Sequence, residues 1–299
     1  MMNYLLKNSA FYVGTNIVYP PFKNGFYMEE YFLNYAIKNY IFHDKNGRLY
    51  IPALWTNFQL ESWFGKNRNI MQQVLNEFIH SHPCANGYFT IVQHDDGPFL
   101  QLPQNTLIYG ACYGHIPLPL IYENRNKSLI ELGVKHKKPF SEKNILCSFV
   151  GCTTHKVRNK CIDILSNEDG FDISIPEKGW KLNVEKMNQD EFIEKTLNSK
   201  FALAPRGYGK SSFRFYEVFQ LGCIPVYVWD DDEWLPYKDI IDYSKICISI
   251  HENQINELPY ILRQIDETKY EAMRTEYIKI QHMFELEFMC KYITSHNLV

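Results

Sequence analysis

The sequence predicts an α/β fold in which the strands of a parallel, doubly wound sheet alternate with helices. The alternation is clearest in the second half of the chain, where short apolar runs occupy residues 145–150, 201–204 and 224–229. The first of these runs is almost uninterrupted, which is typical of a strand buried on both faces. Helical patterns separate the runs, so the strands are expected to be parallel.

The remaining elements of the second half follow in order. A strand is predicted at 246–250, a helix from about residue 252, and a helical tail over 269–292 with Tyr277 and Phe284 near one face. Upstream, the polar, lysine-rich stretch 123–143 has little apolar pattern and predicts an interdomain linker.

The first third combines helices with strands. Apolar residues at helical spacing predict helices over parts of 27–41 and 70–79. Strands are predicted at 88–93 and 106–112.

Length and composition limit the class of protein. A chain of 299 residues with 45% hydrophobic residues accommodates two domains of ordinary size. The net charge of −3 gives no basic footprint for nucleic acid. No stretch approaches the roughly 20 apolar residues of a membrane span, and the start lacks the apolar core of a secretory signal. We therefore expect a cytoplasmic protein whose eight cysteines are reduced thiols, since no Cys-x-x-Cys pair occurs.

The segment 199–229 is the most informative. An apolar run leads into a Pro-Arg-Gly-x-Gly turn, after which Ser211 or Ser212 caps a helix that stops at Gly222. Such a helix start attracts anions through unpaired N–H groups and the positive end of the dipole. Arg206 and Arg214 bracket it, so the pattern predicts a phosphate-binding loop.

Two further charged groups belong to this prediction. Glu217 lies three residues after Arg214 and shares its helix face, which suits a nucleotide diphosphate with Arg on phosphate and Glu on ribose. An ordinary helical salt bridge explains the same spacing equally well. Arg158 follows the loop after a strand, where open parallel sheets bind ligands.

Acidic residues form two other candidates. Asp95 and Asp96 end the strand at 88–93 and could act as a general base, although a turn with solvated acids is the commoner explanation. The run 230–233 has the carboxylates that hold a divalent metal, yet we favour an exposed loop there. His80, His82 and Cys84 have no partner cluster at metal spacing and indicate a helix end, so no metal site is predicted.

These motifs resemble the exostosin family of glycosyltransferases. The resemblance covers about half the chain and is carried by residues 200–207, 212–217, 222–226, 235–239 and 241–245. It extends more weakly to 149–151 with Arg158 and to 88–95. Small versions of this kind without an anchor resemble exostosin-like transferases of large algal viruses. Tyr208 and Lys210 occupy the variable loop, and Asp96 stands where an aromatic residue is common.

The resemblance implies a GT-B fold, with two Rossmann-like domains facing across a cleft and a C-terminal helix crossing back. The domains would be 1–137 on the acceptor side, 138–268 for the nucleotide sugar, and 269–299 packing back on the first. The donor would be held by Arg158, Arg206, Gly207, Tyr208, Ser211, Ser212, Arg214 and Glu217.

The implied reaction is an inverting transfer of xylose or another UDP-linked sugar to a hydroxyl of a glycan acceptor. Asp95 is the first candidate for the base and Asp96 the second. No cofactor is required, and a divalent metal is possible but not expected, since the acidic run at Asp230 leaves that question open. A non-catalytic protein that binds nucleotide sugar or glycan is one alternative. A Rossmann enzyme that modifies nucleotide sugars, such as an epimerase, is another.

Overall fold

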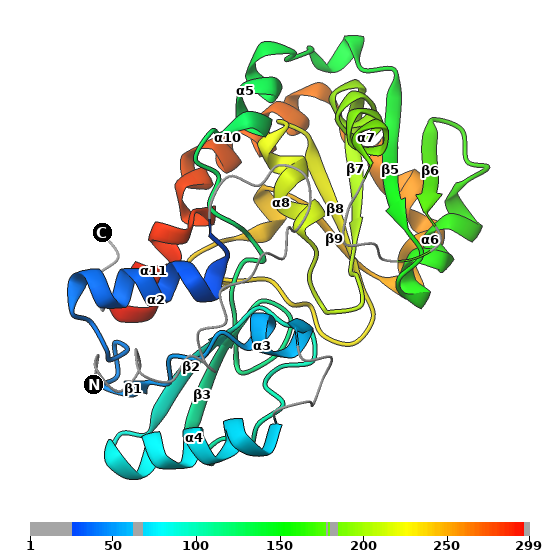
Figure 1. Cartoon of the computed structure of the whole chain (residues 1–299). Helices are drawn as coiled ribbons and strands as arrows, with labels where there is room; N and C mark the ends of the chain where they lie inside the picture. Colours follow the sequence, from blue (N-terminus) through cyan, green and yellow to red (C-terminus); the bar gives the residue numbers. More distant parts are fainter. Residues whose placement is uncertain (1–25, 62–67, 178, 180–184, 296–299) are drawn as a thin grey trace. The chain divides into compact units, whose positions relative to one another are not determined.

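The structure is a computed structural model that describes residues 26–61, 68–177, 179 and 185–295. The chain divides into two compact units. Among the described residues, the first unit comprises 26–123 and 283–295, and the second comprises 124–282. Each unit is an α/β structure around a parallel sheet (Figure 1), which confirms the predicted pair of Rossmann-like halves.

The second unit contains a five-stranded parallel sheet in the order β6-β5-β7-β8-β9. The strands are β5 (Ile145–Cys152), β6 (Phe171–Glu177), β7 (Ser199–Pro205), β8 (Ile224–Trp229) and β9 (Ile248–His251). The chain first runs outward from β5 to β6 and then crosses back to β7. The neighbours β5 and β7 therefore form a topological switch point, where ligands bind at the carboxyl ends of the strands.

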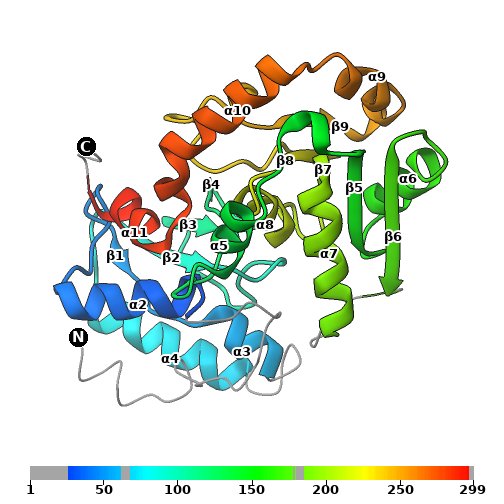
Figure 2. The ribbon, with the colours of Figure 1, turned by 90° about the horizontal axis from the view of Figure 1, so that it is seen from above.

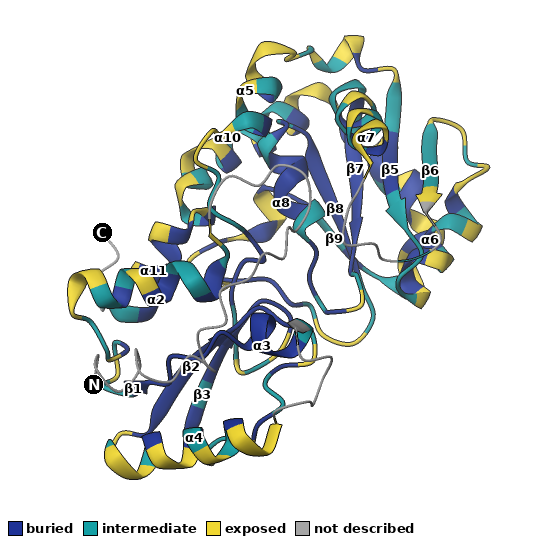
Figure 3. Cartoon of the chain, in the orientation of Figure 1, coloured by how far each residue is buried: buried dark blue, intermediate teal, exposed yellow. Residues whose placement is uncertain are grey.

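Helices cover both faces of this sheet, because its strands alternate apolar side chains between the two sides. Phe201 and Leu203 of β7 join a core with helices on one face, and Ala202 joins a core on the other. The first face carries α6 (Lys156–Leu165), α9 (Leu258–Arg263) and α10 (Glu267–Ile280); the second carries α5 (Ser128–Lys135), α7 (Lys186–Asn198) and α8 (Phe213–Gln220). Figure 2 shows α10 and α7 on opposite sides, and Figure 3 shows the buried central strands.

The first unit contains a four-stranded parallel sheet in the order β1-β2-β3-β4. Its strands are β1 (Leu49–Tyr50), β2 (Tyr88–Val92), β3 (Thr106–Gly110) and β4 (Ile116–Pro117), and its helices are α2 (Met28–Asn39), α3 (Trp55–Glu61), α4 (Arg68–Ser81) and α11 (Leu286–Thr294). A core of aromatic and aliphatic side chains joins α3 and α4 to the sheet. The helix end expected at His80 to Cys84 is confirmed, because α4 stops at Ser81.

The expected linker at 123–143 is wrong. It contains α5 and the short 3-10 helix η2 (Phe140–Glu142), and Leu129 of α5 is fully buried. Gly133 lets α5 approach α8 closely, because a Cβ there would lie 2.8 Å from the Gln220 carbonyl oxygen. The first unit therefore ends at Glu123 instead of residue 137, since α5 packs within the second unit.

The predicted tail helix is also divided. α10 remains with the second unit, where Tyr270 contacts Phe201 edge to face and Tyr277 stacks on Phe219 with ring centroids 4.1 Å apart. After the 3-10 helix η5 (Gln281–Phe284), α11 returns to the first unit and packs on α2. The C-terminal helix thus crosses back as expected, but only from residue 283 onward.

Burial of the Tyr270 ring predicts a large stability effect. Tyr270→Ala removes a side chain that is fully buried between the sheet and η2, so the free energy of unfolding should fall by about 3–5 kcal/mol. Tyr260→Ala, at a tyrosine that is 68% exposed, is the control and should change it by less than about 0.5 kcal/mol. Urea unfolding of both variants checks this, and equal effects would contradict the packing.

Candidate functional site

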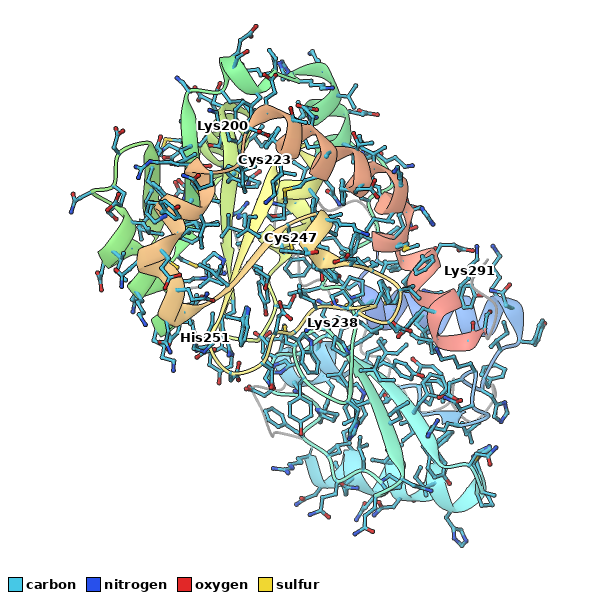
Figure 4. The ribbon with its side chains drawn as sticks, turned by 180° about the vertical axis from the view of Figure 1, so that it is seen from behind. Lys200, Cys223, Lys238, Cys247, His251 and Lys291 are labelled. Carbon is cyan, nitrogen blue, oxygen red and sulfur yellow. The ribbon has the colours of Figure 1, made fainter. Side chains whose placement is uncertain are left out.

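The site is built at the carboxyl edge of the second sheet, where the loops after β5, β7, β8 and β9 lie. Figure 4 shows the two ends of this sheet: Lys200 and Cys223 lie at the end where strands begin, and His251 lies at the opposite end. Two helices begin at this carboxyl edge, each with a side-chain cap. His155 Nδ1 accepts from Val157 N at the start of α6, and Ser212 Oγ accepts from Arg214 N at the start of α8. Ser212 is therefore the cap that the sequence left open between two serines.

Arg158 is buried at the switch point and joins the two central strands. Its Nε donates to the carbonyl oxygen of Arg206 at 3.0 Å, and Nη1 donates to that of Cys152 at 3.2 Å. Its Nη2 donates to Pro205 O and to Ser212 Oγ, each at 3.4 Å. Each guanidinium nitrogen thus has a protein acceptor. These contacts give Arg158 a positioning role for the loop.

Arg206 is buried in a network of carboxylates. Its Nη1 lies 2.6 Å from Asp230 Oδ1 and 2.7 Å from Asp231 Oδ1, and Nη2 donates to the Tyr208 carbonyl oxygen. Within the part of the chain that the structure describes, Arg206 Nε is buried without a hydrogen-bond partner. A buried donor without a partner is uncommon in folded proteins.

The expectation that 230–233 forms an exposed loop is wrong for Asp230. Its side chain is only 8% exposed and pairs with Arg206 and with Lys156 Nζ at 3.1 Å. Partial burial raises the pKa of Asp230, but the bonds from these two cations outweigh that effect and lower the pKa to about 2. The carboxylate is therefore ionised and neutralises part of the positive charge. Asp231 and Asp232 are half or more exposed.

Arg214 and Glu217 form the helical ion pair that the spacing allowed. Arg214 Nη1 lies 3.1 Å from Glu217 Oε2, and the guanidinium carbon lies 3.5 Å from the centre of the Phe192 ring on α7. Burial raises the pKa of Glu217, while Arg214 opposes the shift. The ordinary salt bridge that the spacing allowed is therefore present, and the arginine side chain is 25% exposed.

The loop between β7 and α8 is closed by its own backbone. Gly207 N donates to the Ser211 carbonyl oxygen at 3.3 Å, and Tyr227 OH donates to that of Lys210 at 2.7 Å. Ser211 is buried, whereas the Tyr208 side chain is 62% exposed. Gly207 lies against Arg158, with Nη2 3.4 Å from where a Cβ would be. The structure thus brings all the predicted donor-side residues together at one sheet edge.

Asp95 and Asp96 belong to the first unit, in the turn after β2. His94 is buried, which lowers its pKa despite the neighbouring Asp95 and Asp96, and its Nδ1 accepts from Asp96 N. The side-chain amide of Gln59 makes two hydrogen bonds to the backbone of the turn: Nε2 donates to Gly97 O, and Oε1 accepts from Phe99 N. Asp96 is exposed and Asp95 is half-buried on this fixed turn.

Glu29 is a residue that sequence reasoning missed. Its carboxylate is buried on α2 and accepts from Gln93 N at 2.7 Å, from Thr56 N at 2.9 Å and from Thr56 Oγ1 at 2.9 Å. Glu29 therefore joins the carboxyl end of β2 to the start of α3, directly before the turn that carries Asp95. No local pattern could reveal it, because its partners lie 27 and 64 residues away in the sequence.

A comparison with protein families assigns the second unit. Residues 114–265, which hold β4 to α9 and the whole carboxyl-edge site, match the model of the Exostosin GT47 domain. This match covers half of the chain. The chain belongs to the exostosin family. The resemblance seen in the sequence is thereby confirmed.

The similarity to curated relatives is local. The exostosin-1 homolog of Caenorhabditis elegans is 34% identical over 85 residues, which is 28% of this chain and 22% of that protein. Exostosin-1 of Drosophila melanogaster is 38% identical over 90 residues, 29% of this chain and 12% of the relative. The aligned segment thus spans about a fifth or less of these exostosins. A solved structure, that of TarM, aligns over 74% of this chain and 57% of its own with 10% identity and a TM-score of 0.36.

The described residues carry neither a membrane-length apolar helix nor a cluster of three His, Cys, Asp or Glu side chains placed to hold a metal. All eight cysteines are free thiols.

The environment of Glu29 predicts a pH-dependent stability. Burial raises its pKa from 4.5 to about 7, although the three hydrogen bonds lower it. The folded state therefore holds the proton more tightly than the unfolded state. The contribution of Glu29 to stability is therefore complete below about pH 4.5. As the pH rises to about 7 this contribution is lost, and the free energy of unfolding falls by up to about 3 kcal/mol.

Glu29→Gln should remove this slope, since the amide does not titrate. We expect the stability of the variant relative to the parent to rise between pH 5 and 8, in chemical unfolding at each pH. Parallel curves for the two proteins would show that the burial of Glu29 does not affect its titration.

Proposed function

We propose that the protein is an inverting glycosyltransferase that moves a sugar from a UDP-linked donor to a hydroxyl of a glycan. The observation that carries the proposal is the carboxyl-edge cluster of the second unit, which lies inside the matched Exostosin GT47 domain. Positive charge gathers at one switch point. It comes from the starts of α6 and α8, from Arg206 with its unpartnered Nε, and from the partly exposed Arg214. A nucleoside diphosphate is the substrate class whose charge this arrangement matches.

The roles of the donor-side residues follow from their contacts. Departure of the diphosphate develops negative charge, which Arg206, Arg214 and the start of α8 would stabilise. Arg158 would hold the carboxyl ends of β5 and β7 in place through its carbonyl contacts. Glu217, whose carboxylate is held in place by Arg214, is the candidate for the ribose hydroxyls. Tyr208, exposed beside the loop, offers a ring face to the nucleotide.

An acceptor hydroxyl needs a base, and Asp95 remains the first candidate with Asp96 the second. Both lie on a turn that Gln59 and Glu29 hold from two sides. A fixed carboxylate satisfies the geometric requirement of general base catalysis better than a mobile one. The charge of Arg206 and Arg214 on the leaving group allows a reaction that needs no metal ion, and xylose is among the candidate sugars.

A donor screen tests the nucleotide site. We expect one member of a panel of UDP- and GDP-sugars to raise the melting temperature and to be slowly hydrolysed, equally with and without EDTA. Arg214→Gln keeps a donor for Glu217 but removes the charge, and should weaken donor binding by about 10- to 100-fold. Arg263→Gln, at an arginine that is 45% exposed and bonded to Asp169 O, is the matched control. Undiminished binding by the Arg214 variant would refute the assignment.

Replacing the carboxylates separates an enzyme from a binding protein. Asp95→Asn should reduce transfer at least about 100-fold, and Asp96→Asn should do so if Asp96 is the base instead. Donor affinity, measured by calorimetry, should be unchanged in both variants because the carboxylates act on the acceptor. Full transfer by both variants would exclude them as the base. A parent protein that binds donor and has no transfer or hydrolysis favours the non-catalytic alternative.

A further inference from the structure

Tyr113 is an exposed aromatic side chain at the carboxyl edge of the first sheet. Other tyrosines of this sheet are buried: Tyr50, Tyr88 and Tyr109 are exposed by 1%, 5% and 0%. Tyr113, three residues beyond the end of β3, is 46% exposed. Single exposed aromatic rings are common on protein surfaces, so the case for this ring depends on where the fold places it.

The ring rests directly on the turn that carries Asp95 and Asp96. A Cβ at Gly97 would lie 2.3 Å from Tyr113 Cδ1, so only a glycine lets the ring lie there. Gly97 also has a φ of +74°, which favours glycine independently. The ring therefore packs against the backbone of Gly97, the residue that follows Asp96 in the turn.

The backbone of Tyr113 is fixed as well. A Cβ at Gly110 would lie 1.7 Å from the Tyr113 carbonyl oxygen, and Gly114 has a φ of +124°. Beyond the turn, Ile108 and His115 exchange two bonds: His115 N donates to Ile108 O at 2.9 Å, and Ile108 N donates to His115 Nδ1 at 3.0 Å. The tyrosine is thus presented by a short, closed loop, so binding would order few additional groups.

We propose that Tyr113 is a sugar platform, on which a pyranose ring of the acceptor stacks while Asp96 accepts a hydrogen bond from one of its hydroxyls. The C–H groups on the flatter face of a pyranose suit the negative face of an aromatic ring. The carboxylate of Asp96, one residue before the glycine on which the ring packs, would supply a strong, charge-assisted acceptor. The inference rests on the proposed function in so far as the sugar is the acceptor; the contact surface itself does not depend on catalysis.

The experiment measures binding of methyl β-xylopyranoside and methyl β-galactopyranoside by saturation-transfer NMR. The parent protein should saturate the protons of one sugar face most strongly. Tyr113→Leu keeps apolar bulk but removes the aromatic ring, and should weaken binding by about three- to tenfold. Tyr113→Phe should retain it. Tyr40→Ala, at a tyrosine of the same unit that is 77% exposed, is the control and should bind as the parent does.

UDP-induced thermal shift in the same variants separates the two proposals. Unchanged UDP shifts with weakened glycoside binding support the platform. Loss of the UDP shift in Tyr113→Leu would mean that the ring contacts the nucleotide, which overturns the acceptor assignment. Binding of neither glycoside by the parent, or equal binding by Tyr113→Leu, also overturns it. If glycoside binding depends on Tyr113 but no donor sugar is bound or hydrolysed, the platform stands and the glycosyltransferase proposal fails.

Discussion

The buried guanidinium of Arg158 is the interaction on which the second unit's site depends. A charge without water is costly unless its hydrogen bonds are replaced. Here the carbonyl oxygens of Cys152, Pro205 and Arg206 replace them, and these groups come from the ends of two neighbouring strands. The same guanidinium reaches Ser212, which caps α8. One side chain thus fixes the spacing of β5 and β7 and the position where the next helix begins.

Around this centre the edge of the sheet is nearly balanced in charge. Asp230 pairs with Arg206 and Lys156, Asp231 pairs with Arg206 as well, and Glu217 pairs with Arg214. These carboxylates hold the cations in place and compensate the burial of Arg206. They also mean that an incoming anion competes with existing partners.

In the first unit, three separate contacts fix the turn that follows β2 and carries Asp95 and Asp96. Glu29 binds the backbone just before the turn, Gln59 clasps its far side, and Tyr113 covers Gly97. Each contact comes from a different part of the chain. The result is a pair of carboxylates whose backbone is fixed although the side chain of Asp96 remains in water.

The sequence by itself determined the elements whose signal is local. These are the strand at β7, the glycine turn, a cap at one of the two serines and the apolar face of α8, because propensity and periodicity act within a few residues. The spacing also placed Arg214 and Glu217 on one face.

Only the tertiary structure decided which charges meet. Arg158 with Arg206 O, Asp230 with Lys156, and Glu29 with Gln93 are joined by strand order and crossover, over separations of 48, 74 and 64 residues. It also decided that α5 packs on α8 instead of forming a linker, because Gly133 matters only once a second backbone lies against it. Pairing at such distances follows from the topology of the sheets, which no short pattern encodes.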